Sequence, residues 1–500
     1  MSLTAGAVAT VTEPPSVLPE MPVTASDLRL KMAHNSPMMV ADPTDGRFVA
    51  LASRVDGPDF GCSLHVSADG GRVWAPAQPV SKLPPGAEKC YAPEIAFDGE
   101  GRLYYLFVGL HGTGNMPMGA FLTVSTDRAR TFSAPRRVLG PDQYMVRLVV
   151  DAESGSRGRL HLVWLQTREP ATLGSLPEGP NPIVAAYSDD GGETFSKPVP
   201  VSGRDRRRPV APSVAVGPDH VVHVLFYDLG DDARDYHGLE GPTYEGSWSL
   251  VLSTSADGGR RYARETVVDG EVTPNERVML IFTMPPPALA VDGADRVYAA
   301  WTDARNGDWD ALFARSTDGG GRFASPVRLN DDRAGDGRHQ YQPRLDVSPG
   351  GRVDAVFYDR RNDPANVSND VYLTYSTDAG RTFAPNLKLT TEMSDTRLGQ
   401  TYVGPAAAGL VEWGSRTGLL AQASGAVAAW TDTRVKPFAK TIQQDVFSTR
   451  VVFDDEGNPA PRSSGRPLAT WLGSAGTVAA LGGAVLWRSR RPAKSTETEA

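Results

Sequence analysis

Short apolar runs separated by glycine- and proline-rich breaks make up most of the chain. Residues 287–291, 296–301, 310–315 and 325–329 form four such runs in succession, rich in Ala, Val, Leu and aromatic residues. Runs of this length and composition, bounded by turn residues, predict β-strands. The same frame can be followed along the rest of the chain, so the sequence predicts repeated units of four strands.

An eight-residue motif marks these units. It reads Ser-x-Asp-x-Gly-x-x-aromatic and appears six times, with successive aspartates 58, 63, 67, 61 and 60 residues apart. In a tight hairpin turn, the carboxylate accepts backbone N–H bonds and the glycine takes the positive-φ position. The second copy has Ala129 instead of glycine, which predicts a strained turn. We therefore expect structural roles for the motif aspartates, which are Asp69, Asp127, Asp190, Asp257, Asp318 and Asp378.

Seven units can be laid out along the chain, and a four-stranded sheet repeated radially is a propeller blade. We predict an all-β fold, a seven-bladed β-propeller over residues 22–455, with six blades as the alternative. The seventh unit shows three strands and no motif, so we expect Asp27–Met32 to supply its outer strand. The first strands of the units are expected near Pro37, Pro93, Val146, Pro212, Pro287, Pro343 and Gly404.

The C-terminal region has a different pattern. Residues 467–487 carry no charge, and a basic cluster from Arg488 to Lys494 follows directly. A helix of this length spans roughly 31 Å, which matches a membrane's hydrocarbon core. We predict a transmembrane helix at 467–487, a linker at 456–466 and a basic cytoplasmic tail at 488–500, with the propeller extracytoplasmic. A buried helix or a glycine-rich tail is the alternative, and residues 1–21 are read as a flexible N-terminus or signal remnant.

Charge and cysteine content narrow the range of functions. The net charge of −8 argues against nucleic-acid binding, which needs a concentrated basic surface. Cys62 and Cys90 lack the Cys-x-x-Cys spacing of metal and redox sites. The predicted topology brings them to neighbouring segments at one end of the propeller. We expect a disulfide between them, and two inert thiols are the alternative.

Polar and aromatic residues collect at the end of the predicted propeller opposite the motifs. They lie before the first strands or in the turns between second and third strands, and they are Tyr91, Glu94, Tyr144, Arg147, Tyr341, Arg344, Tyr402, Asp303, Asp359 and Asp432. Converging side chains of these types predict a polar pocket for a sugar or an acidic ligand. The structural alternative is that each Asp-x-Arg sequence ties its own turn, and that Glu94, Arg147 and Arg344 form salt bridges between blades.

No cofactor or metal ion is expected. His220 and His223 lie three residues apart in a predicted strand, and therefore on opposite faces. Residues 363–370 carry side-chain oxygens that could hold calcium, but turns use the same residue types.

The six motifs resemble the Asp-box, or bacterial neuraminidase repeat, superfamily from about residue 27 to 455. The resemblance implies a sialidase-like propeller that acts on or binds glycans at the cell surface. By analogy, Arg147 and Arg344 would grip an acidic sugar, Tyr341 or Tyr402 would be a nucleophile assisted by Glu94, and Asp303 or Asp359 the acid/base. Tyr91 and Tyr144 would line the same site. The Arg-Ile-Pro type motif of sialidases is absent, so a non-catalytic, membrane-anchored binding propeller is the alternative.

Overall fold

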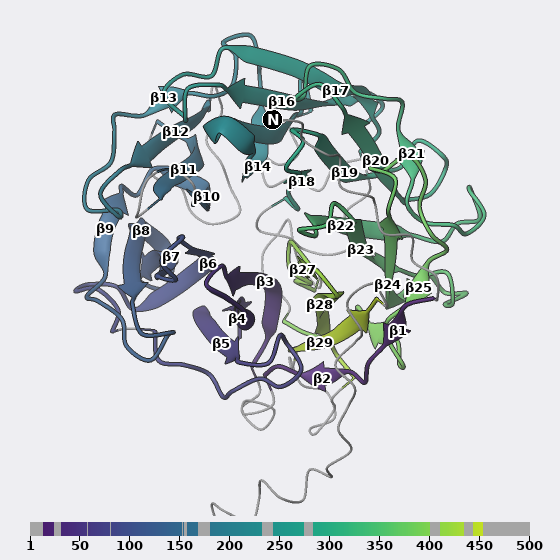
Figure 1. The fold of residues 1–500 in the computed structure, drawn as a ribbon, viewed down its shortest axis with the longest axis horizontal. Coiled ribbons are helices and arrows are strands. Elements are labelled where there is room, and N and C mark those ends of the chain that lie inside the picture. The colour runs from purple at the N-terminus through teal and green to yellow at the C-terminus, as the bar shows by residue number, and fades with distance from the viewer. Residues whose placement is uncertain are drawn as a thin grey trace, which may run out of the picture. The chain divides into compact units, whose positions relative to one another are not determined.

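The computed structural model describes residues 14–24, 32–57, 59–80, 82–152, 154, 158–168, 181–232, 244–274, 284–400, 411–434 and 444–453. Within these ranges the chain forms seven antiparallel sheets arranged around a common axis (Figure 1). The predicted all-β, seven-bladed β-propeller is therefore confirmed. We number the sheets as blades 1 to 7 in the order of their innermost strands.

The blades run outward in chain order, from the innermost strand to the rim. Blade 1 contains β3 (His34–Asp42), β4 (Asp45–Val55) and β5 (Gly61–Ser67), and blade 2 contains β6 (Lys89–Phe97), β7 (Leu103–His111), β8 (Met116–Ser125) and β9 (Arg136–Leu139). Blade 3 contains β10 (Gln143–Asp151), β11 (Arg159–Gln166), β12 (Ile183–Ser188) and β13 (Val199–Pro200). Blade 4 contains β14 (Pro209–Val216), β15 (Val222–Asp228), β16 (Trp248–Ser255) and β17 (Arg264–Val272). A short 3-10 turn, η2 (Pro218–His220), links β14 to β15.

Blades 5 to 7 follow the same plan. Blade 5 contains β18 (Ala288–Val291), β19 (Val297–Asp303), β20 (Asp310–Ser316) and β21 (Val327–Arg328). Blade 6 contains β22 (Gln340–Val347), β23 (Val353–Asp359), β24 (Ser368–Ser376), β25 (Leu387–Lys388) and β26 (Ser394–Asp395). Blade 7 contains β27 (Gly418–Gln422), β28 (Gly425–Asp432) and β29 (Asp445–Val452). The first strand of the seventh unit is thus β27 and lies later than the position near Gly404 that we predicted, because residues 411–417 precede it as a separate segment. Tyr402 lies outside the described residues.

Residues from the two ends of the propeller sequence close the ring. β1 (Ser16–Val17) and β2 (Met21–Pro22) both pair with β29, and so take the outer position of blade 7. Glu20, between them, forms an ion pair with Arg434 of the turn after β28. The predicted donor of this strand, Asp27–Met32, was wrong: two very short strands just upstream occupy the place, and residues 27–31 lie outside the described ranges.

The second strands of the blades carry the largest buried side chains. Trp164, Trp301 and Trp430 are almost completely buried at corresponding positions of β11, β19 and β28. Each indole N–H donates to a side-chain oxygen two residues later, at 2.9 to 3.0 Å. Fully burying a large apolar side chain contributes about 2 to 3 kcal/mol, so each tryptophan anchors its blade to a neighbour without an unpaired N–H.

The six motif turns share one hydrogen-bonding plan. In the third copy, the Ser188 hydroxyl donates to Asp190 at 2.7 Å and accepts the Gly192 N–H at 2.8 Å. Asp190 also accepts the Thr194 N–H and hydroxyl, and these bonds outweigh partial burial and lower its pKa to about 2. Gly192 has a φ of +83°, whereas its counterpart Ala129 adopts +62°, a region that costs a residue with a Cβ about 1 to 2 kcal/mol.

A disulfide joins Cys62 of β5 to Cys90 of β6, with the two Cα atoms 5.8 Å apart. It links blade 1 to blade 2 beside Phe60 and Tyr91, whose rings pack edge to face. None of the helices in the described ranges is long and apolar enough to cross a membrane. The predicted span at 467–487 lies beyond those ranges.

Candidate functional site

The inner strands of five blades share a bend near the end opposite the motif turns. Each pairs with its second strand through a register shift, and the residue within the shift has a positive φ of 49° to 53°. These residues are Ser36, Ala92, Met145, Ala211 and Gln342. Two residues after the bend, the strands of blades 2, 3 and 6 carry Glu94, Arg147 and Arg344. The repeat therefore places three charged side chains at one level of the ring.

Glu94 is the centre of a cluster of arginines. Its side chain is 4% exposed, and Arg147 of blade 3 donates to its Oε1 at 3.0 Å. Arg416, from the segment before β27, forms a second ion pair with the same oxygen. Arg416 also donates to the Pro93 carbonyl at 2.7 Å. Blades 2, 3 and 7 thus contribute to one charged group, which we call the arginine cluster and which also includes Arg344.

Arg344 completes the arginine cluster from the other side of the ring. Burial and the charge of Arg416 lower the pKa of Arg344, while Glu94 and Asp346 act in the opposite direction, so its guanidinium group lies within electrostatic reach of all three. It forms no hydrogen bond or ion pair within the described part of the chain. Arg147 Nη2 is buried and also has no hydrogen-bond partner there. Guanidinium N–H groups are therefore available for a further acceptor.

The arginine cluster carries excess positive charge. Burial alone would raise the pKa of Glu94, but Arg416 and Arg147 outweigh burial and hold its pKa below the ordinary value, so Glu94 is ionised. Burial lowers the pKa of Arg147, yet arginine remains charged at neutral pH. Asp346, two residues after Arg344, accepts backbone N–H bonds from Val347 and Ala421. Even with Asp346 counted as an anion, three guanidinium groups face two carboxylates.

The tyrosines predicted for this site point elsewhere. Tyr341 is 2% exposed, donates its hydroxyl to Asn369 at 2.8 Å and stacks on Tyr358. The Tyr91 hydroxyl accepts from Arg54 at 2.8 Å, and Tyr144 is buried in the apolar core between blades 3 and 4. Within the described residues, no hydrogen bond joins a tyrosine hydroxyl to Glu94.

Asp303 and Asp359 are bound within their own turns. Asp303 accepts from Arg305 at 2.6 and 3.0 Å, and Asp359 accepts from Arg361 at 2.7 and 2.8 Å. Asp432 is held by Arg434 in the same way. The Asp-x-Arg sequences therefore tie their own turns, as the structural alternative predicted. The catalytic roles proposed for Asp303 and Asp359 stay predictions.

Sequence reasoning missed Arg416. It lies two residues before β27. When blades 6 and 7 are aligned by strand pairing, Gly418 corresponds to Arg344, and Arg416 therefore corresponds to Gln342. Alignment of blade 7 on its second strand, Gly425–Asp432, would have placed β27 and identified Arg416. A second buried group was also missed, in which Arg54 contacts Asp56 at 2.7 Å and Glu412 at 2.5 Å. That group lies between blades 1 and 7, and its one arginine bridges the two carboxylates.

No group of three or more His, Cys, Asp or Glu side chains is placed to hold a metal ion in the described ranges. In the stretch 363–370, the Asp363 carboxylate accepts the N–H groups of Ala365, Val367 and Ser368. The carboxylate of Asp363, one of the groups considered as a calcium ligand, is thus engaged in closing a turn.

No protein-family model and no curated protein matches this sequence. Solved structures that resemble it include a Dyadobacter fermentans protein of unknown function, with 14% identity, a TM-score of 0.47, and coverage of 88% of this chain and 99% of that one. An ulvan lyase of polysaccharide lyase family 25 has 12% identity and a TM-score of 0.47, and the match covers 87% of this chain and 96% of that one. A Hadza microbial sialidase has 13% identity and a TM-score of 0.43, and the match covers 82% of this chain and 74% of that one. At these identities and TM-scores, the resemblances carry no argument about activity.

Proposed function

We propose that the protein recognises an acidic sugar of a glycan through the arginine cluster at the centre of the propeller. The observation that carries this proposal is that Arg147 and Arg416 both form an ion pair with Glu94, and that Arg344, within electrostatic reach of Glu94, has no side-chain hydrogen-bond acceptor in the described residues. Buried charges are costly unless they are paired, so an excess of guanidinium groups favours an anionic ligand.

A carboxylate suits the available donors. Guanidinium groups bind carboxylates through two parallel N–H bonds, and Arg344 can offer such a pair. Arg147 Nη2 adds a further donor. Extended polyanions fit less well, because the chain carries a net charge of −8. A single acidic sugar at the end of a glycan matches both the charge and the central position.

The finer proposal is a sialidase-like propeller at the cell surface. The disulfide between Cys62 and Cys90 supports an oxidising, extracytoplasmic compartment, and the uncharged run at 467–487 supports a membrane anchor. The arginine cluster also supports sialidase-type turnover. Binding without turnover is better supported by the contacts of Tyr341, Asp303 and Asp359, which engage these candidate catalytic groups in local structure.

The experiment is a titration of the full-length protein with N-acetylneuraminic acid and with its methyl ester, which removes only the charge. We expect the acid to bind at least tenfold more tightly at the tightest site, and Arg344→Ala to abolish that preference. Arg322→Ala, an exposed residue of a motif turn, is the matched control and should leave it unchanged. Equal affinity for acid and ester would refute the proposal.

A parallel assay decides between binding and catalysis. Release of a fluorescent aglycone from a sialoside by the wild-type protein, lost in Arg344→Ala, would establish a sialidase. Binding of the acid without release of the aglycone would establish a non-catalytic recognition propeller.

A further inference from the structure

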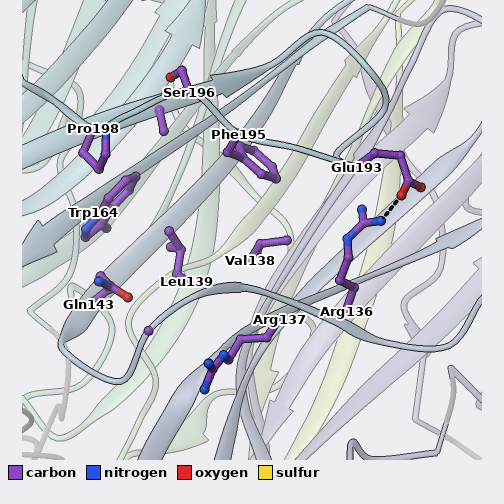
Figure 2. A pocket seen from close by; sticks show the side chains of 12 residues that line it. Arg136, Arg137, Val138, Leu139, Gln143, Trp164, Glu193, Phe195, Ser196 and Pro198 are labelled. Carbon is purple, nitrogen blue, oxygen red and sulfur yellow. Dashed lines mark hydrogen bonds and ion pairs between the residues drawn. The ribbon is translucent and has the colours of Figure 1, made fainter.

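A pocket of about 370 Å³ opens at the rim of the propeller, between blades 2 and 3. Figure 2 shows its two walls, with Arg136, Arg137 and Leu139 of β9 on one and Phe195, Ser196 and Pro198 on the other. β9 is the outermost strand of blade 2, and the pocket lies around it. Gln143 begins β10, the strand that also carries Arg147, and the other lining residues come from elements that the arginine cluster does not use. Its volume is within the range of small-ligand sites.

The floor of the rim pocket is apolar and aromatic. Leu139, Trp164 and Ala186 are buried beneath it, while the ring of Phe195 is only partly buried. Phe195 is the aromatic residue of the third motif, and its ring is part of the pocket lining (Figure 2). An aromatic ring in a pocket with polar edges can pack against the C–H groups of a sugar ring while the hydroxyl groups reach polar partners.

Two buried polar atoms at the rim pocket have no hydrogen-bond partner in the described residues. They are Oε1 of Gln143, an acceptor, and Nε of Arg136, a donor. A buried polar group without a partner loses its hydrogen bonds to water and gains none in return, so such atoms favour a ligand that satisfies them. Sugar hydroxyl groups both donate and accept hydrogen bonds, and therefore match this pair of atoms.

The rim pocket also has one unbalanced charge. Arg136 forms an ion pair with Glu193 and donates to the Gly192 carbonyl. Arg137 is exposed, and its side chain forms neither a hydrogen bond nor an ion pair within the described ranges. An exposed guanidinium group can bind a carboxylate in bidentate fashion. The pocket thus combines an aromatic wall, unpaired hydrogen-bonding atoms and a cation.

We propose that the rim pocket is a second glycan-binding site, which takes an acidic sugar of the uronic acid class. Phe195 packs against the pyranose ring, Gln143 and Arg136 bind hydroxyl groups, and Arg137 binds the carboxylate. The site does not depend on the arginine cluster, so a glycan could be held at the rim whether or not the centre binds it.

The test measures saturation transfer from the full-length Arg344→Ala protein to glucuronate and to glucose, which differ in the carboxylate. The Arg344→Ala background removes the open donor of the arginine cluster. We expect glucuronate to bind in this background and to bind at least tenfold more weakly when Arg137→Glu is added. Glucose, which has no charge, should bind weakly and change less than twofold between the two proteins.

Arg322→Glu in the same background is the matched control, because it places the same charge change on another exposed arginine. It should leave glucuronate binding unchanged. The Arg137 side chain makes no hydrogen bond or ion pair in the described residues, so both variants are expected to fold, which a thermal unfolding curve checks. Absence of transfer to glucuronate in Arg344→Ala, or equal transfer with and without Arg137→Glu, would overturn the proposal.

Discussion

Ion pairs at the centre of the ring differ in construction from those in the repeated turns. Asp303, Asp359 and Asp432 each take an arginine two residues away, so the pair forms as soon as the turn forms. Glu94 instead takes arginines from blades 3 and 7, which are far away in the sequence. Each turn arginine also pairs with a second carboxylate from elsewhere in the chain, which is Asp269, Asp331 or Glu20. Carboxylates therefore outnumber the arginine in each repeated turn, whereas the central group has guanidinium groups in excess. The difference separates charges that build the fold from charges available for binding.

Removal of the central anion should have the largest effect. Glu94→Gln leaves three neighbouring guanidinium groups with only Asp346 as a counter-charge, and breaking a buried pair typically costs about 3 to 5 kcal/mol. Chemical denaturation of the full-length protein should show that the free energy of unfolding falls by this amount in Glu94→Gln. Asp231→Asn, in an exposed pair with Arg207, is the control and should change stability by less than about 0.5 kcal/mol. Similar losses in both variants would remove the distinction.

Acid should weaken the packing between blades before it affects the arginine cluster. His161 is buried between blades 3 and 4, and burial, with Arg159, lowers its pKa to about 4. Because the folded pKa is below the unfolded value of 6.5, the stability is fully present above pH 6.5 and is lost as the pH falls towards 4. The loss amounts to about 3 kcal/mol.

Glu94, whose pKa is lowered, contributes stability that is lost only below its unfolded pKa of 4.5. Denaturation curves between pH 7 and 4.5 should therefore show a decline that His161→Gln reduces. If His161→Gln keeps the full decline, this histidine is not its source.

Neutralising the aspartate of a repeated turn should have a moderate effect on stability. Asp359→Asn weakens two bonds to Arg361, which keeps Asp331 and Asn386 as partners. We expect a loss of about 1 to 2 kcal/mol and an unchanged affinity for N-acetylneuraminic acid. If Asp359→Asn instead abolished turnover of a sialoside while the protein stayed folded, Asp359 would be a catalytic acid/base.

The smallest predicted effect is a gain. Ala129→Gly should stabilise the protein by about 0.5 kcal/mol, because glycine adopts positive φ without strain but loses more chain entropy on folding. Gly192→Ala is the reciprocal control and should destabilise, since a Cβ there would lie 2.5 Å from Leu122 Cδ2. A loss of stability in Ala129→Gly would show that the alanine methyl group contributes more by packing than its backbone costs.

The parts of the fold that repeat could be predicted, and the parts that do not repeat could not. Six motifs and their flanking strands set blade number and placed Glu94, Arg147 and Arg344 at one end of the ring, because each depends on local turn chemistry. Blade 7 has no motif, so its first strand was placed too early and Arg416 was missed. β1 and β2 are two residues each, too short to show alternation. Which arginines reach Glu94 depends on closure of the ring, which no local pattern encodes.

The pairing of β1 and β2 with β29 has a consequence for synthesis of the chain. Val17 pairs with Val451, so the first strand must wait for almost the whole propeller to be translated. At about 5 to 20 residues per second, that interval is roughly 20 to 90 s. During it blade 7 is incomplete, and until Arg416 emerges Glu94 lacks one of its two cations. A nascent chain stalled before blade 7 would therefore hold several folded blades and an unfinished binding centre, and such chains are natural clients for chaperones.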